Sequence, residues 1–191
     1  MTEPKPLRAD ARRNRARVLS AAEDVFAAQG TGASTEEVAR AAGVGIGTVF
    51  RHFPTKEALL EAVLLERLHR FVAEVARWAE AEDPGNAFYS FLGQWVDMGT
   101  AKNAYIDALA AAGAAAPRLG GEAQQRVLDA LGTLLTRAQR AGTVREDVEV
   151  PELIALLVGA SRALEYLGED TSSRRRTVQI IFDGLRPSHR R

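Results

Sequence analysis

The sequence predicts an all-α fold of about nine helices, and three observations predict it. Apolar residues recur at the three- and four-residue spacings of an amphipathic helix through most of the chain. Capping residues and glycines stand where these segments end. Alternating runs rich in Val, Ile and Thr, which are typical of strands, are absent from the sequence.

The expected N-terminal elements follow from local signals. Residues 1–9 hold two prolines and no apolar periodicity, which indicates a flexible arm. A first helix begins at about Asp10 and ends near Gly30. Ser34 and Glu37 have the spacing of a capping box that begins a second helix, and Gly43 suits the left-handed residue that ends it.

The remaining elements are expected to be helices as well. A short third helix covers 46–53 and stops before Pro54, and Thr55 caps a long fourth helix that reaches about residue 79. Further helices are predicted at about 85–99, 101–115, 122–141, 151–168 and 172–185.

Composition limits the class of protein. The chain has 191 residues, of which 46% are hydrophobic and 26% charged, so it can fold as one or two compact domains. Because it has no cysteine, a disulfide scaffold, thiolate metal sites and a cysteine nucleophile are excluded. No apolar window reaches the length of a membrane span and no apolar signal core follows the basic start, so a cytoplasmic protein without membrane contact is expected.

Residues 34–53, STEEVARAAGVGIGTVFRHF, satisfy the physical demands of a helix-turn-helix. Ala39 is small where the two helices cross, and Gly43 permits the tight turn. The expected buried contacts are Val38, Ala42, Val44, Val49 and Phe53.

Other residues of this segment are of the types that bind DNA. Gly47 lets the backbone approach a duplex, Thr48 can bond a base edge or a phosphate, and Phe50 can lie against a thymine methyl group. Thr35 stands at a helix N-terminus, where free N–H groups favour a phosphate, whereas a solvated helix face explains Arg13 about as well as a phosphate contact does. The predicted DNA-binding residues are Arg13, Thr35, Gly45, Gly47, Thr48, Phe50, Arg51, His52 and Lys56.

Together with RVLSAAEDVFAAQG at 17–30, the string STEEVARAAGVGIGTVFRHFPTKEALL at 34–60 resembles the tetracycline-repressor (TetR) family of bacterial regulators. The resemblance covers about residues 10–65. It implies three DNA-binding helices, a larger helical domain with a small-molecule pocket, and a homodimer formed by the last two helices. By position, it places DNA contacts at Thr35, Gly47, Thr48, Phe50, His52 and Lys56.

The chain departs from the family pattern at two positions. Gly45 stands where the family usually has Ser, and Phe50 stands where Tyr is more usual. Each departure removes a hydroxyl group that can reach a phosphate, so DNA anchoring is expected to be modestly weaker.

The predicted domains are the arm at 1–9, a DNA-binding domain at 10–56 and a ligand-binding and dimerisation domain at 57–191. The charge divides in the same way. Residues 1–56 carry nine basic and six acidic residues, net +3, and the remainder carries 16 and 19, net −3. Because phosphates respond to local charge, the overall net charge of zero does not exclude a DNA partner.

Large side chains gather between residues 71 and 105, accompanied by a few polar ones. Such a set can line a pocket for a small apolar or amphipathic ligand, although core packing explains the same residues equally well. The predicted ligand-binding residues are Phe71, Trp78, Phe91, Trp95, Met98, Asn103 and Tyr105.

The last two helices are apolar on more than one face, which exceeds what one domain core can bury. Small residues such as Gly159 and Ala163 allow another helix to approach, so a two-fold homodimer interface is expected. The predicted interface residues are Leu153, Leu156, Leu157, Ala160, Leu164, Val178, Ile181 and Phe182.

The sequence therefore predicts a one-component transcriptional regulator, expected to be a repressor, that binds a palindromic operator in double-stranded DNA and is released by a small molecule. One alternative is a DNA-bound regulator without an inducer, whose second domain serves only dimerisation or protein partners. A second alternative is an enzyme, but no Ser/His/Asp trio, His-x-x-x-His spacing or phosphate-cradling Gly loop occurs, so no catalytic residue, metal or cofactor is expected.

Overall fold

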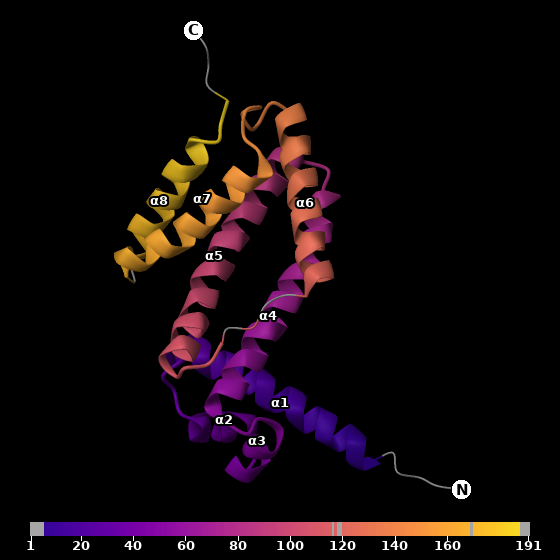
Figure 1. Ribbon diagram of the computed structural model, residues 1–191, viewed down its shortest axis with the longest axis vertical. Helices are drawn as coiled ribbons and strands as arrows, with labels where there is room; N and C mark the ends of the chain where they lie inside the picture. Colours follow the sequence, from indigo (N-terminus) through magenta and orange to yellow (C-terminus); the bar gives the residue numbers. More distant parts are fainter. Residues whose placement is uncertain (1–5, 116, 118–119, 169, 188–191) are drawn as a thin grey trace, which may run out of the picture. The chain divides into compact units, whose positions relative to one another are not determined.

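A computed structural model shows the all-helical architecture that the sequence predicts (Figure 1). It describes residues 6–115, 117, 120–168 and 170–187. Within these ranges it contains eight α-helices, one 3₁₀-helix and no strand. The elements are α1 (Pro6–Gln29), α2 (Thr35–Ala42), α3 (Ile46–His52), α4 (Lys56–Ala79), α5 (Pro84–Ala111), α6 (Gly121–Arg140), α7 (Val150–Ala163), η1 (Leu164–Leu167) and α8 (Thr171–Asp183).

Helices α1 and α5 differ from the elements that the sequence predicts. Helix α1 begins at Pro6 rather than Asp10, because proline has no N–H to lose and its φ already suits the first turn of a helix. Of the predicted arm, residues 1–5 lie outside the described residues. The two helices expected at 85–99 and 101–115 form the single helix α5, in which the Thr100 hydroxyl donates to the Val96 carbonyl at 3.0 Å.

The chain divides into two compact units, and the division differs from the predicted boundary after Lys56. The first unit consists of residues up to Arg67 together with 104–118, and the second of 68–103 together with the residues from 119 onward. Helices α4 and α5 are continuous, and each contributes one end to each unit. No linker separates the units at these points, which explains why composition did not reveal the boundary.

The second unit has its own hydrophobic core, to which α4, α5, α6, α7 and α8 all contribute. Phe88, Phe91, Leu92, Leu131 and Leu134 are fully buried in it. Arg137 of α6 ties the end of α4 to this core, because its guanidinium donates to the carbonyls of Ala79 and Ala81, the latter at 2.6 Å. A cation at these last carbonyls also complements the helix dipole of α4.

Helices α5 and α7 cross within the second unit at a contact between small residues. A methyl group added at Gly99 would stand 2.7 Å from the Cβ of Ser161. The hydroxyl of Ser161 donates to the Val158 carbonyl at 2.9 Å and is therefore satisfied inside α7. Glycine at position 99 is what permits the two helices to approach this closely.

We expect Gly99→Ala to lower the free energy of unfolding by about 1–3 kcal/mol, because the new methyl group forces the α5–α7 crossing apart. Gly93→Ala on the same helix is the matched control, since nothing lies within 4 Å of a Cβ there. Alanine should leave stability unchanged at that position or raise it by about 0.5–1 kcal/mol. Urea unfolding followed by circular dichroism measures both variants, and equal effects would contradict the close crossing.

Candidate nucleic-acid interface

Helix α2 begins with the capping box that the sequence predicts. The Ser34 hydroxyl accepts from the Glu37 N–H at 3.2 Å, and the Glu37 carboxylate accepts from the Ser34 N–H at 2.7 Å. The Ser34 hydroxyl also lies 3.0 Å from the same carboxylate. The hydrogen bonds from the backbone N–H and then the hydroxyl of Ser34 lower the pKa of Glu37 below its usual value. Each of the two side chains therefore satisfies a backbone N–H group at the start of α2.

The turn between α2 and α3 is held from α1. Gly43 adopts φ +64°, as predicted, and the Val44 N–H donates to the Ala39 carbonyl at 3.0 Å. Arg17 of α1 donates to the Ala42 carbonyl at 2.9 Å and places its charge at the C-terminal end of α2. The Arg15 guanidinium lies over the Phe53 ring, 5.0 Å from its centre. Both arginines therefore support the helix-turn-helix, a role that their place in a basic stretch of sequence did not reveal.

Helix α3 presents one side to the interior and the other to solvent. Val49 and Phe53 are buried, as predicted, and so are Val38 and Ala42 of α2, whereas Val44 is half-buried. The outward side of α3 carries Ile46, Gly47, Phe50 and Arg51, all of which are exposed. Thr48 and His52 are half-buried on its flank, so the predicted reading residues do not share one fully exposed face.

Three other predicted DNA-binding residues have partners within the protein. The Thr35 side chain is buried and its hydroxyl lies 3.5 Å from the Glu36 carboxylate, so a phosphate at this position would meet backbone N–H rather than hydroxyl. Lys56 donates to the Gly32 carbonyl at 2.9 Å, and Arg13 forms an exposed ion pair with Asp10. An exposed pair of this kind contributes little to stability, so Arg13 can exchange Asp10 for a phosphate.

The residues predicted to bind a ligand do not come together as one set. Phe71, Phe91 and Trp95 form an aromatic cluster in the core of the second unit, with ring centres 5.7–5.8 Å apart. Trp78 and Met98 pack against the same core as partly buried residues, and the Trp78 indole donates to Gln94 at 3.2 Å.

Asn103 and Tyr105 have structural roles of their own. The buried Asn103 side chain donates to Glu165 at 2.7 Å within the second unit. Tyr105 belongs to the first unit, where its ring meets Phe26 edge-on with ring centres 6.3 Å apart. Burial of its hydroxyl raises the pKa of Tyr105. The residues predicted to line one pocket therefore belong to two separate units, because α5 runs from one unit to the other.

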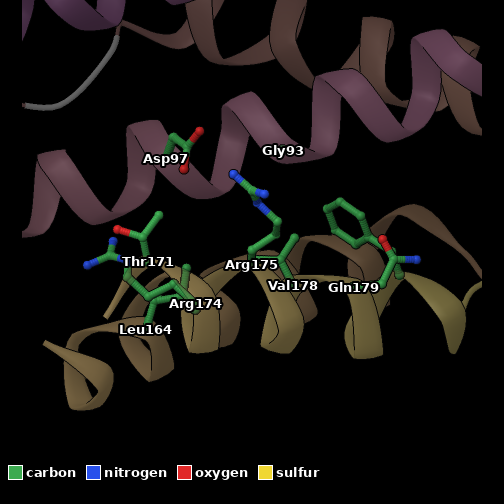
Figure 2. Close-up of a pocket in the computed structure, with 9 residues that line it drawn as sticks. Gly93, Asp97, Leu164, Thr171, Arg174, Arg175, Val178 and Gln179 are labelled. Atoms are coloured by element: carbon green, nitrogen blue, oxygen red, sulfur yellow. The ribbon is translucent and has the colours of Figure 1, made fainter. Parts of the chain in front are cut away.

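The second unit has a groove between α5 and α8 that the sequence did not predict. Its volume is about 380 Å³, and Leu164, Val178 and Phe182 supply apolar lining. Arg175 extends from α8 toward the stretch of α5 that holds Gly93 and Asp97 (Figure 2). The predicted ligand-binding residues do not line this groove.

The residues predicted for the dimer interface differ in how far they reach the surface of the subunit. Five of its residues are buried inside the subunit, because the core uses one side of α7 and of α8; they are Leu153, Leu157, Ala160, Leu164 and Phe182. Leu156 is exposed, and Val178 and Ile181 are half-buried. Among the large apolar residues whose exposure the structure describes, Val158, Tyr166 and Ile180 are the most exposed, with exposed fractions of 51%, 94% and 62%.

Two other kinds of feature are absent from the residues that the structure describes. No group of three or more His, Cys, Asp or Glu side chains is arranged to hold a metal ion in the part of the chain that the structure describes. In the same residues, no helix combines the length and apolar character that crossing a membrane requires.

A capped helix, a left-handed glycine turn and a short helix with a solvent-facing side define a helix-turn-helix DNA-binding protein. Residues 18–63 match the family model described as bacterial regulatory proteins, tetR family, and residues 83–187 match that of the transcriptional regulator SbtR-like C-terminal domain. The chain belongs to the TetR family of transcriptional regulators. The proteins of this family are DNA-binding regulators and not enzymes.

Solved structures of the family resemble the whole chain. A TetR transcription regulatory protein from Mycobacterium vanbaalenii is 46% identical, with a TM-score of 0.69 over 95% of this chain and 100% of that one. The regulator SCO0520 from Streptomyces coelicolor is 34% identical, with a TM-score of 0.70 over 91% and 99%. Among curated relatives, the transcriptional regulator SrpR of Pseudomonas putida is 45% identical over 62 residues, which are 32% of this chain and 29% of SrpR. The chain spans less than half the length of the curated relatives that it matches first.

We expect Ser34→Ala to lower the free energy of unfolding by about 1 kcal/mol, the usual cost of removing an N-cap side chain. For Glu37, the lowered pKa means that its stabilising effect is complete above pH 4.5 and is lost as the pH falls through the lower pKa of the folded state. The stability difference between wild type and Glu37→Gln should therefore narrow below pH 4.5.

Urea titrations between neutral and acidic pH measure this dependence, with Glu36→Gln as the matched control, since Glu36 does not cap α2. A Glu37→Gln difference that stays constant with pH would argue against the carboxylate cap.

Proposed function

We propose that this regulator is a repressor that binds a palindromic operator as a homodimer and leaves it when a small molecule binds the second unit. The DNA-binding part of this proposal is supported mainly by the outward side of α3. Buried Val49 and Phe53 fix the helix from behind, and Ile46, Gly47, Phe50 and Arg51 face solvent. A helix held in this way fits the major groove of B-DNA.

Flanking groups supply contacts to the DNA backbone in this proposal. Arg51 and His52 lie in the last turn of α3, and α3 contains no acidic residue. Together with Lys56, the backbone at Thr35 and Arg13, they can bind phosphates on either side of the groove. Gly45 and Gly47 have open space around them, so the α3 backbone can approach bases closely.

Dimerisation is supported by the apolar side chains that α7, η1 and α8 leave in solvent. Leu156, Val158 and Tyr166 come from α7 and η1, and Ile180 comes from α8. No atom lies within 4 Å of the place where a Cβ of Gly159 would stand, so a second helix can approach there. In a two-fold dimer the two α3 helices would enter successive major grooves about 34–36 Å apart.

Release by a ligand is supported by the groove between α5 and α8. The groove volume falls within the usual range of about 300–1,000 Å³ for small-molecule sites. The close packing of Phe71 on Phe91 favours the second candidate, a DNA-bound regulator whose second unit serves only dimerisation or protein partners. The two candidates differ in one measurable property. A ligand that weakens operator binding would favour the repressor that a small molecule releases.

Selection from a pool of random duplexes with the full-length protein tests operator binding, and we expect an inverted repeat to emerge. Arg51→Ala should then weaken binding to all duplexes alike. It should also reduce the slope of the logarithm of the association constant against the logarithm of the salt concentration by about 1, because one phosphate contact is lost. Thr48→Ala should instead change the preferred bases. Recovery of random duplexes without any shared repeat would refute the proposed function.

For the dimer, we expect sedimentation to show two subunits for the wild-type protein. Val158→Glu and Ile180→Glu should each raise the dissociation constant by about tenfold or more, because a carboxylate loses water in an apolar interface. Ala28→Glu is the control, since Ala28 is an exposed residue of α1 in the first unit. A wild-type monomer, or variants that dimerise as well as the wild type, would count against this interface.

A further inference from the structure

Two large apolar side chains of the first unit reach solvent in the part of the chain that the structure describes. They are Ile46 and Phe50, with exposed fractions of 36% and 41%. Both belong to α3, and their spacing of four residues places them one above the other on the same side of the helix. Phe50 occupies a position that the family pattern marks for DNA, whereas nothing in that pattern assigns Ile46 a role.

Other side chains hold α3 against the rest of the first unit. Val49 and Phe53 anchor the helix, with exposed fractions of 0% and 3%. Gly45 and Gly47, on either side of Ile46, have no atom within 4 Å of the place where a Cβ would stand. Ile46 therefore projects from a stretch of bare backbone, and exposed apolar groups that adjoin each other in this way mark a binding surface.

The charges around the pair indicate what covers it. Arg51 is exposed on the same helix, and Ile46–His52 contains no acidic residue. A partner must therefore combine negative charge with small apolar groups. In the major groove, phosphates supply the charge and the C5-methyl group of thymine is the apolar group that a side chain can touch.

We propose that Ile46 and Phe50 form an apolar stripe that reads thymine methyl groups in each half-site, and that Ile46 is a determinant of operator sequence. This inference rests on the proposed function. Ile46 has no hydrogen-bonding group, so it discriminates by contact with a methyl group alone. Removal of that group from the DNA should have the same effect as shortening the side chain.

The probe is the duplex that the full-length protein selects from a random pool. Each thymine of the half-site is replaced in turn by deoxyuridine, which keeps all base-pair hydrogen bonds and lacks only the methyl group. We expect the dissociation constant to rise about two- to fourfold at the thymines that the stripe contacts, the effect of one buried methyl group. Deoxyuridine outside the half-sites should have no effect.

The variants locate the contact on the protein. Ile46→Ala should weaken binding to the thymine duplex by about the same factor and abolish the loss at one deoxyuridine position, whereas Ile46→Val should retain that loss. Phe50→Ala should abolish the loss at a neighbouring position. If the wild-type protein binds its duplex and no deoxyuridine changes the affinity, the stripe is refuted while operator binding stands. If no duplex is selected, both the proposed function and the stripe fail.

Discussion

The position of α3 depends on how firmly the end of α2 is held. Gly43 turns the chain in a left-handed conformation, and Arg17 of α1 binds the Ala42 carbonyl that this turn leaves open. The capping box at Ser34 fixes the other end of α2. With both ends fixed, Val49 points inward and the opposite side of α3 faces solvent. Everything that the protein is proposed to do with DNA follows from this orientation.

The second unit depends on close contacts of a different kind. Gly99 leaves room for Ser161 at the crossing of α5 and α7, and Arg137 binds the carbonyl of Ala79 at the end of α4 and that of Ala81 just after it. Helices α4 and α5 each continue from this unit into the first one. In the proposed function, a ligand must change the affinity for DNA by favouring one arrangement over another, and these two helices would be the covalent routes that transmit that preference.

The sequence predicted those features that local chemistry decides. The capping box, the Gly43 turn, the all-α class and the burial of Val38, Val49 and Phe53 are all confirmed. What the sequence did not reveal are tertiary contacts between residues distant in the sequence. Composition cannot show which side of an apolar helix the core uses, and Leu153 and Leu157, which were predicted to lie in the dimer interface, are buried inside the subunit. Nor can it show that Arg17 binds a carbonyl 25 residues away.

Amide hydrogen exchange of the full-length protein, free and bound to its selected duplex, tests most directly whether the orientation of α3 determines function. We predict that DNA slows exchange mainly in α3 and in the Gly43 turn before it, together with α1, which holds that turn. Slower exchange confined to residues 83–187, with α3 unchanged, would contradict it.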